Sequence, residues 1–367
     1  MGDGIESLIG KIWASALDGD DHGAVDAAVA ALDDGLPVED LLLDVVAPVQ
    51  LRVGDAWAAN EVTVAQEHIA TAVGERVLAA AARHRAARAR HVGVNGRAAV
   101  ACVDGEWHAF PARLLAEVLR LNGWRVDYLG PHVPTPYLPI HVRGSEADVV
   151  LLSASLPTRL PAAHEAIRAC RETGRPVLAG GAAFGADGRY ARMLGADGWA
   201  PDGRGAAYHL AGRPVRGSVP DPTTSPAPEM AAPERAGQDA PPGPEYAYVA
   251  GIAQDLADSV VQDLSEHLPE MAAYTARQRK HTRDDIGHII DFLAMSLYVT
   301  DRTLFSRFLL WTAGVLTARD VPEETLLPAL ELVAAGLEGC PGARETVEHG
   351  REVLRGERGK QKPRHPF

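Results

Sequence analysis

A histidine and two carboxylates follow a predicted buried strand in the segment DGEWHAF. The apolar run AAVACV is typical of a strand in a parallel sheet, and His108 lies in the loop that follows it. An imidazole suits a transition metal such as cobalt, and its second ring nitrogen usually donates to a carboxylate. Glu106 and Asp104 are both close enough in sequence to supply that carboxylate. The segment predicts a metal ligand, although a loop histidine without a metal has the same local pattern.

Two further loops follow predicted strands and carry residues that suit a bound ligand. The run DVVLL leads into Ser153 and Ser155, which supply hydroxyl groups, and the run PVLAG ends at Gly180 and Gly181. Glycine lets a planar group approach the backbone closely because it has no side chain. Each motif alone is weak evidence, since tight turns use the same residues. The carboxyl ends of parallel strands share one sheet edge, so the loops are expected to face one ligand.

Together and in this order, the three loops resemble the cobalamin-binding domain. The motifs of that family are Asp-x-His-x-x-Gly, Ser-x-Leu or Ser-x-Thr, and Gly-Gly. The resemblance implies that His108 displaces the dimethylbenzimidazole of cobalamin and ligates its cobalt, while the displaced tail enters a slot lined by the serine and glycine loops. The chain departs from the pattern at Glu106, which keeps a carboxylate, and at Pro111, which can begin the next helix.

A tryptophan and a Glu-His pair stand in the earlier helical segment WAANEVTVAQEH. Trp57 precedes Glu67 by ten positions, and His68 follows directly. This spacing, with VGDAW before it and IATAV after it, resembles the light-sensing adenosylcobalamin proteins of the CarH type. The resemblance implies that the tryptophan packs over the adenosyl group and that the Glu-His pair forms hydrogen bonds around it. The alternative is a core tryptophan beside a solvated helix face.

Two features of the CarH-type repressors are not found in this sequence. Those repressors begin with a winged-helix DNA-binding domain of the MerR kind, whereas this sequence begins at the helical segment, so no nucleic acid partner is expected. The residue after the tryptophan is Ala58, where those repressors have a histidine that captures cobalt once light has expelled the adenosyl group. A bis-histidine light state made from this position is therefore not expected.

The elements that must position these residues change in character along the chain. Residues 1–92 place apolar residues at helical spacing and predict a four-helix bundle that caps the cobalamin. Residues 93–212 alternate short apolar runs with helical stretches, which predicts a doubly wound, Rossmann-like parallel sheet with its ligand at the carboxyl ends of the strands.

The remaining sequence divides into a linker, a helical domain and a tail. Residues 213–245 are rich in Pro, Ala and Gly and predict a semi-rigid linker. Residues 246–355 return to helical periodicity and predict a second all-α domain, for which helical dimerisation is the simplest role. Residues 356–367 predict a disordered tail. The fold class expected for the whole chain is multidomain, α plus α/β.

The segment HTRDDIGHIIDF carries a polar face that suits a linear tetrapyrrole. His281, Asp284 or Asp285, and His288 recur on one helical face, and Arg283 lies nearby. Carboxylates can accept hydrogen bonds from pyrrole N–H groups, and Arg or His can pair with propionates. The segment therefore indicates a bilin site.

The same residues also fit simpler roles. Thr282 and Asp285 have the spacing of a helix capping box, and His288 could be a satisfied, partly buried histidine. A globin-like domain could instead hold haem, with His288 or His281 as the iron ligand.

The order of a cobalamin photosensory module, a linker and a helical domain resembles the photocobilins. That resemblance implies a globin-like second helical domain and two chromophores, adenosylcobalamin and biliverdin. It also implies a light sensor, not an enzyme, that signals through domain packing, a light-dependent homo-oligomer or a downstream protein partner. A corrinoid carrier for methyl transfer is the alternative.

Composition excludes several classes of protein. The chain has 367 residues and a formal net charge of −13, which opposes nonspecific binding to nucleic acid. No apolar run reaches the roughly 18 residues that a membrane span needs, and the first residues lack the pattern of a secretory signal. No membrane partner is therefore expected. The three cysteines form neither a metal-ligand spacing nor a disulfide framework, which indicates a cytoplasmic protein.

Overall fold

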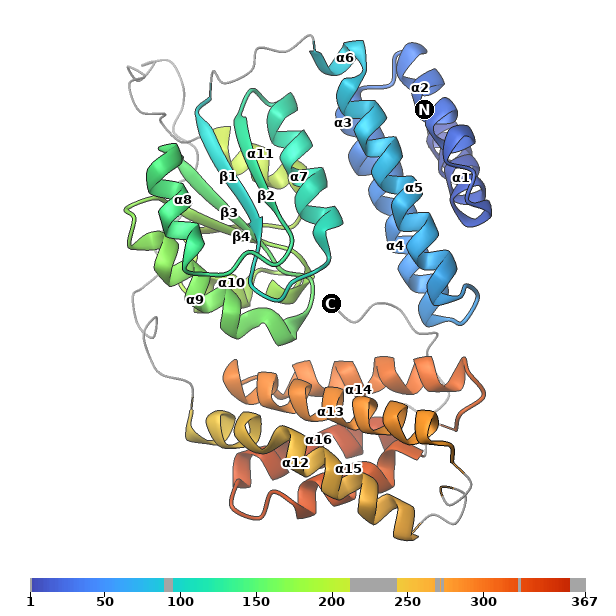
Figure 1. Ribbon diagram of the computed structural model, residues 1–367, viewed down its shortest axis with the longest axis vertical. Helices are drawn as coiled ribbons and strands as arrows, with labels where there is room; N and C mark the ends of the chain where they lie inside the picture. Colours follow the sequence, from blue (N-terminus) through green and yellow to red (C-terminus); the bar gives the residue numbers. More distant parts are fainter. Residues whose placement is uncertain are drawn as a thin grey trace. The chain divides into compact units, whose positions relative to one another are not determined.

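The computed structural model separates into two compact units, which are described one at a time. The first unit holds residues 1–57 and 62–238, and the second holds 239–366 together with 58–61 (Figure 1). The predicted tail, 356–367, lies outside the described residues after Gly356, and so does the predicted linker, 213–245, except for its last three residues. The structure describes residues 2–88, 95–211, 243–267, 271, 274–322 and 325–356.

The first unit opens with a bundle of helices, the cap. Apolar residues of its first helix that recur at helical spacing, such as Leu8 and Ile12, are buried in the bundle as the pattern predicts. Pro37 precedes the third helical stretch, where its missing N–H needs no partner. A single π-helical stretch, η1, joins α3 to α4 without a break. The cap comprises α1 (Gly2–Asp18), α2 (Asp21–Asp33), α3 (Val38–Asp40), η1 (Leu41–Val46), α4 (Ala47–Ala58), α5 (Val64–Arg83) and α6 (Arg85–Arg88).

The sheet domain follows with five parallel strands in the order β2-β1-β3-β4-β5. The chain changes direction across the sheet between β1 and β3, and ligands of such sheets bind at that point. β1, β3 and β4 overlap the predicted apolar runs AAVACV, DVVLL and PVLAG, whereas the three-residue β5 was missed because so short a run gives no pattern. The strands are β1 (Arg97–Cys102), β2 (Arg125–Gly130), β3 (Val149–Ser153), β4 (Val177–Gly180) and β5 (Gly198–Ala200).

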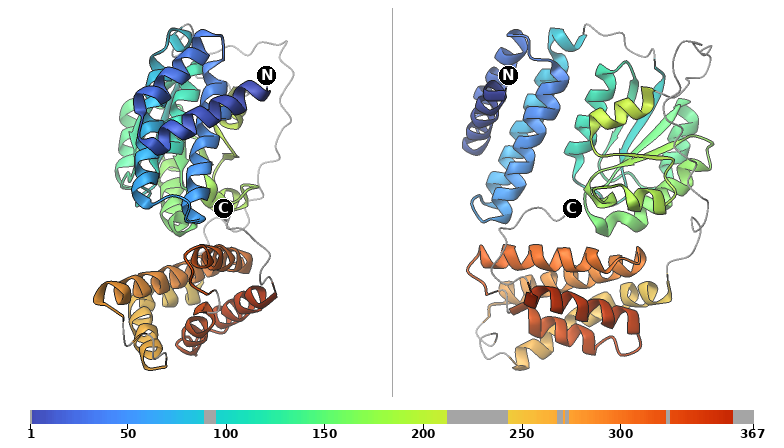
Figure 2. Two further views of the ribbon diagram at one scale, coloured as in Figure 1. Left: turned by 90° about the vertical axis from the view of Figure 1, so that its right-hand side faces the viewer. Right: turned by 180° about the vertical axis from the view of Figure 1, so that it is seen from behind.

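Helices cover both faces of this sheet, which makes the domain doubly wound. α7 and α11 pack together on the face turned toward the cap, and α8 and α9 pack together on the other face (Figures 1 and 2). The helical elements are α7 (Ala109–Leu121), α8 (Tyr137–Ser145), η2 (Pro157–Arg159), α9 (Leu160–Arg171), η3 (Ala182–Phe184), α10 (Arg189–Met193) and α11 (Gly203–Ala211).

α7 joins the cap and the sheet into one apolar core. Leu114, Val118 and Leu121 of this helix are buried in the same cluster as the apolar residues of α1, α2, α4 and α5. At the edge of this contact, Arg204 of α11 pairs with carboxylates of the cap helices, Asp44 among them. The cap is therefore held on the sheet domain by burial, with an exposed charge cluster at its margin.

The second unit is helical throughout its described residues. Phe292 and Phe308 stack with their ring centroids 3.8 Å apart in its core, and Arg351 is buried with ion pairs to Glu331 and Glu348. The globin-like arrangement expected here stays a prediction. The helices are α12 (Pro244–His267), α13 (Ala276–Tyr298), α14 (Arg302–Thr317), α15 (Leu326–Ala335) and α16 (Pro341–Gly356).

The start of α13 corrects one sequence interpretation. The capping box of this helix is formed by Thr275 and Gln278, not by Thr282 and Asp285. Thr282 lies inside the helix and donates its hydroxyl to the carbonyl oxygen of Gln278. The capping role predicted for Asp285 was therefore wrong, because the helix begins two turns earlier than that motif required.

Among the described residues, no helix is both long enough and apolar enough to cross a membrane.

Candidate functional site

Three strand-end loops meet at one edge of the sheet. Cys102, the last residue of β1, pairs with Ser153 at the end of β3, and Ser153 pairs with Gly180 at the end of β4. This register places the loop of His108, the serine loop and the glycine loop side by side. The structure thus brings together the residues that the three sequence motifs predicted.

His108 and Glu106 form a hydrogen-bonded pair at this edge. Nδ1 of His108 lies 2.6 Å from Oε1 of Glu106, and the backbone N–H of His108 donates to the same oxygen over 2.8 Å. The Glu106 side chain is 1% exposed, whereas that of His108 is 56% exposed. Because Nδ1 is turned to the carboxylate, Nε2 is the nitrogen that can ligate a metal.

Burial and hydrogen bonds shift the pKa values of both members of this pair. Burial alone would raise the pKa of Glu106, but hydrogen bonds from His108 and from the backbone of Ser155 lower it below its ordinary value. The same hydrogen bond raises the pKa of His108 against the opposing effect of burial, and the charge of Glu67 in the cap raises it further. Glu106 therefore orients the imidazole and makes it a stronger base.

The structure decides between the two carboxylates that the sequence left open. Asp104 does not orient His108; it lies 3.1 Å from Nδ1 of His132, which also accepts the backbone N–H of Gly105. The carboxylate of Glu106 reaches the next loop as well, since the N–H groups of Ser155 and Leu156 donate to its Oε2. Ser155 thus contributes its backbone to the site, a role that no side-chain motif predicts.

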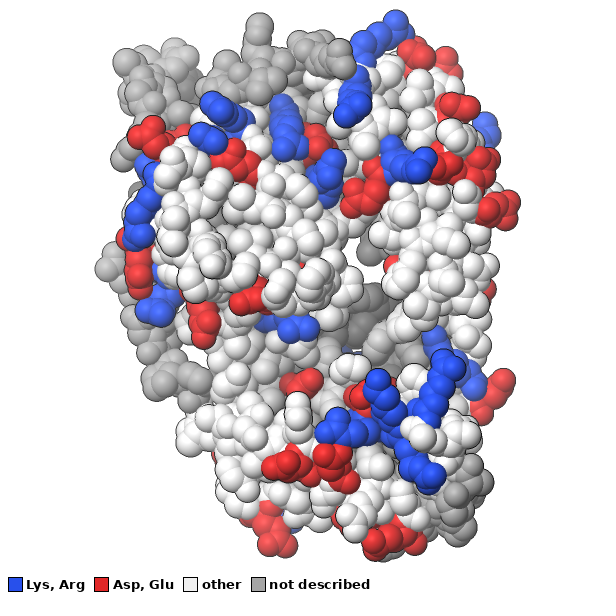
Figure 3. All heavy atoms as spheres, in the orientation of Figure 1, with Lys and Arg blue, Asp and Glu red and all other residues white. Residues whose placement is uncertain are grey.

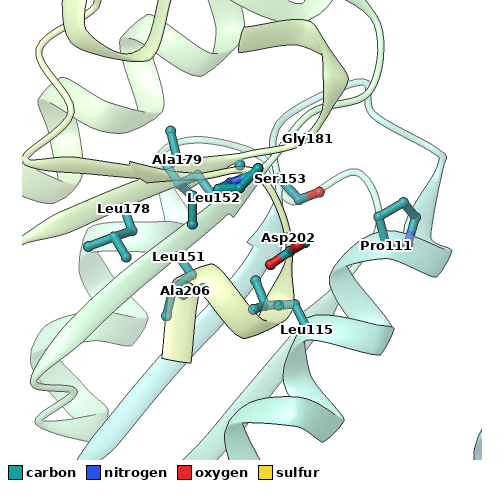
Figure 4. A pocket seen from close by; sticks show the side chains of 14 residues that line it. Pro111, Leu115, Leu151, Leu152, Ser153, Leu178, Ala179, Gly181, Asp202 and Ala206 are labelled. Carbon is teal, nitrogen blue, oxygen red and sulfur yellow. The ribbon is translucent and has the colours of Figure 1, made fainter. Parts of the chain in front are cut away.

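A cavity of about 100 Å³ lies beside the serine and glycine loops (Figure 4). Ser153 and Gly181 line it from the ends of the strands, and Leu115 lines it from α7. Asp202 and Ala206 could not be predicted from the motifs; the segment PDG after the undetected β5 was the available signal. The lining is mostly apolar and comprises Pro111, Leu115, Leu151, Leu152, Ser153, Leu178, Ala179, Gly180, Gly181, Ala200, Pro201, Asp202, Gly203 and Ala206.

Position 181, which lines this cavity, requires glycine. Gly181 has φ +101°, and a Cβ there would lie 2.3 Å from the carbonyl oxygen of Ala154. A Cβ on Gly180 would lie 3.4 Å from the carbonyl oxygen of Ala200. The contact at Gly180 is an ordinary one, whereas Gly181 lets the glycine loop lie close against the backbone of the serine loop, beside the cavity.

The cap residues lie where helices α4 and α5 meet. Trp57 is partly buried near the end of α4, and Glu67 and His68 lie in the first turn and a half of α5. Nδ1 of His68 is 2.5 Å from Oε2 of Glu67, and the hydroxyl of Thr71 donates to Oε1 of Glu67 over 3.0 Å. The His68 side chain is 75% exposed, so it is available to a ligand.

The predicted bilin residues lie on α13 of the second unit. His281, Asp284 and His288 are exposed, and Arg283 forms a bidentate ion pair with Asp258 of α12. Asp285 is also at the surface, but partial removal of its carboxyl group from water raises its pKa. Figure 3 shows basic side chains gathered over the first half of this helix. The structure places the five residues on one helix and pairs Arg283 with a neighbouring helix.

Two family models match the first unit. A B12 binding domain matches residues 96–211, and a second B12 binding domain model matches residues 8–81. Both segments are cobalamin-binding domains. The matches coincide with the sheet domain and the cap, so the predicted cobalamin cofactor and the Rossmann-like fold of its domain are confirmed.

A curated relative matches part of the chain. The HTH-type transcriptional repressor CarH of Myxococcus xanthus is 32% identical over 145 residues, which are 38% of this chain and 46% of that repressor. The chain therefore spans less than half the length of this relative.

Three solved structures resemble parts of the chain. The monomethylamine corrinoid protein of Methanosarcina barkeri is 18% identical, with 56% of this chain and 97% of that chain covered at a TM-score of 0.49. The methanol:cobalamin methyltransferase complex MtaBC of the same organism is 20% identical, with 56% and 81% covered at 0.31. A cobalamin-binding protein of Desulfitobacterium hafniense DCB-2 is 16% identical, with 56% and 97% covered at 0.30.

Proposed function

We propose that the chain is a light sensor that uses adenosylcobalamin. The observation that carries this proposal is the set of Trp57, Glu67 and His68 at one end of the cap, where Trp57 is partly buried and Glu67 holds the exposed His68. A bulky upper ligand needs a shaped, partly apolar lid of this kind, whereas methyl transfer needs an exposed upper face. The partial similarity to CarH agrees with this interpretation.

When bound, adenosylcobalamin supplies absorption of visible light and a cobalt–carbon bond that light breaks. The chain binds and orients it from both sides. His108 offers Nε2 from the sheet edge, Glu106 fixes the imidazole, and Trp57 packs over the adenosyl group with Glu67 and His68 as hydrogen-bonding partners. Loss of the adenosyl group would leave Trp57 without its packing partner and would allow the cap to shift against the sheet domain.

The signal leaves the molecule through packing, not through catalysis. A cap that takes two positions presents two different surfaces, so a light-dependent homo-oligomer or a downstream protein partner can distinguish them. Ala58 follows Trp57 where CarH-type repressors have a histidine, so the upper ligand of the light state differs from theirs. On this proposal the protein is a sensor and not an enzyme.

Biliverdin is the second chromophore of the proposal. The polar face of α13, with His281, Asp284, Asp285 and His288, offers acceptors for pyrrole N–H groups and partners for propionates. The basic side chains gathered along the first half of this helix add favourable charge for those propionates (Figure 3).

Reconstitution with adenosylcobalamin tests the cobalamin part. We expect a dark-stable spectrum that converts under green light, together with altered elution on a sizing column. His108→Ala should remove the spectral signature of histidine-ligated cobalt, while His22→Ala, a control at a residue 91% exposed on α2, should keep it. Trp57→Ala should weaken the preference for the adenosyl form over methylcobalamin without abolishing binding.

The alternative, a corrinoid carrier for methyl transfer, predicts no response to light. Turnover of methylcobalamin with a methyl donor, with no response to light, would identify a corrinoid carrier and refute the sensor. An unchanged spectrum of His108→Ala would refute the assignment of the cobalt ligand.

Titration with biliverdin tests the second chromophore. We expect a red-absorbing complex whose formation is weakened by His281→Ala and His288→Ala together, with cobalamin binding unchanged in the same variant. Binding of haem in place of biliverdin, or of neither, would reject this part and leave the cobalamin part standing.

A further inference from the structure

An arginine without a partner lies beside the predicted cobalt ligand. Arg159 ends the short turn η2, which follows the strand-end loop that carries Ser153 and Ser155. Among the residues that the structure describes, the Arg159 side chain forms no hydrogen bond or ion pair, and its Nε atom is buried. Neither the sequence motifs nor the role of the cap accounts for this side chain.

Its guanidinium rests against the loop that holds the metal ligand. A Cβ placed on Gly105 would lie 2.8 Å from Nη1 of Arg159, so Arg159 covers the backbone next to Glu106. Gly105 in turn precedes Glu106, the carboxylate whose Oε1 lies 2.6 Å from Nδ1 of His108. Arg159 therefore lies at the same sheet edge as the predicted cobalt ligand.

The carboxylate of Glu106, the residue after Gly105, has no free acceptor to offer Arg159. Oε1 of Glu106 accepts hydrogen bonds from the backbone N–H and the ring Nδ1–H of His108, and Oε2 accepts them from the backbone N–H groups of Ser155 and Leu156. A carboxylate offers about four acceptor sites, and these four contacts fill them. An arginine keeps its charge and its five donors at any ordinary pH, so a buried donor without an acceptor is costly.

We propose that Arg159 binds an oxygen acceptor of cobalamin at this edge. The acceptor is a carboxamide oxygen on the rim of the corrin ring or a phosphate oxygen of the nucleotide tail, and either suits the planar fork of a guanidinium. The inference rests on the cobalamin binding of the proposed function and not on its light response.

Dark titration with two corrinoids tests the contact. Aquacobalamin carries both acceptors, whereas cobinamide keeps the ring carboxamides and lacks the nucleotide tail with its phosphate. Arg159→Met keeps an apolar stem without charge or donors and should raise the dissociation constant of aquacobalamin roughly 10- to 100-fold. Arg159→Lys, which keeps the charge without the fork, should give a smaller loss. Arg168→Met on α9, whose side chain is 63% exposed, is the matched control and should bind normally.

The two corrinoids also identify the acceptor. Equal loss for both points to a ring carboxamide, and loss for aquacobalamin alone points to the phosphate. A structural role would appear as a lower melting temperature of the cofactor-free Arg159→Met protein, which we expect to be unchanged or higher. Wild-type affinity in both Arg159 variants would overturn the inference alone, whereas a wild-type protein that binds neither corrinoid would overturn the proposed function as well.

Discussion

At the level of single residues, Glu106 connects the loops of the sheet edge. Its buried carboxylate binds His108 on one side and the backbone of Ser155 and Leu156 on the other. An aspartate is one methylene shorter, so the glutamate found here reaches two loops while it fills the position of the family's carboxylate. The metal ligand and the serine loop are therefore positioned by one side chain.

Replacing this carboxylate should cost stability in a way that depends on pH. Glu106→Gln should lower the free energy of unfolding of the cofactor-free protein by about 1–3 kcal/mol at pH 7, because two charge-assisted contacts are lost in a buried place. The pKa of Glu106 is lowered in the folded state, so its contribution is present above its ordinary value of 4.5 and is lost as the pH falls below it. The pKa of His108 is raised in the folded state. The stabilisation from its charge is therefore lost as the pH rises through this raised pKa.

Urea unfolding of both proteins across pH 3 to 9 measures this difference. We expect the gap between wild type and Glu106→Gln to be largest between the two pKa values and to shrink on either side. A gap that is constant with pH would mean that the carboxylate acts through shape and not through charge.

Gly181 makes a second prediction at this scale. Gly181→Ala should destabilise the protein by at least about 1 kcal/mol, because the new Cβ meets the carbonyl oxygen of Ala154 at a positive φ. It should also weaken cobalamin binding, since the same backbone borders the cavity. Gly144→Ala on α8 is the control, because nothing lies within 4 Å of its added Cβ; it should be neutral or slightly stabilising. Equal melting temperatures of the two variants would contradict the steric argument.

At the level of elements, the cap is fixed to the sheet domain by two kinds of contact of unequal strength. Leu114 of α7 is 6% exposed within the shared apolar core, whereas the side chain of Arg204 is 46% exposed where it meets its carboxylates. Removing a buried leucine side chain typically costs about 2–5 kcal/mol, and an exposed ion pair contributes about 0–1 kcal/mol. Burial therefore decides how firmly the cap is held.

Paired variants test this ranking. Leu114→Ala should lower the midpoint of urea unfolding of the first unit strongly and at every salt concentration. Arg204→Ala should lower it slightly, and only at low ionic strength, because salt screens exposed charges. If Arg204→Ala proved the more damaging of the two, the charge cluster and not α7 would hold the cap.

The sequence predicted the elements whose patterns repeat and missed those that depend on tertiary context. Runs such as AAVACV and DVVLL gave strands because buried parallel strands are apolar throughout. The three-residue β5 carries no comparable signal, so Asp202 was missed with it. The choice of Glu106 over Asp104 also needed the fold, since only the folded chain shows which carboxylate the imidazole meets.

The first residue of a helix also could not be predicted from sequence alone. Thr275 with Gln278 and Thr282 with Asp285 are both capping patterns in sequence, and only the first lies at a helix start. α13 begins directly after Thr275, so Thr282 lies inside the helix, and spacing alone does not show which of the two patterns is used. The bilin residues remain predictions for a related reason: a shared helix face describes a surface, and a chromophore site needs walls from other helices.

At the level of the whole molecule, charge should oppose the assembly that the proposed signal requires. Each chain carries a formal net charge of −13, so two copies repel one another at long range. At roughly 0.15 M salt the screening length is about 8 Å, and at 1 M it is about 3 Å. Association driven by apolar surface should therefore strengthen as salt is added.

Light scattering on a sizing column, in the dark and after illumination, tests this argument with the adenosylcobalamin-loaded chain. We expect one state to have the larger mass, and its share to rise between 0.05 M and 0.5 M NaCl as the repulsion is screened. The share should also rise at constant salt as the protein concentration increases, which separates association from a change of shape. A larger species that dissociates as salt is added would show that charge pairs across the contact outweigh the net repulsion. An equal mass in both light states at every salt concentration would remove oligomerisation from the mechanism and leave the cap's movement to act on a different protein.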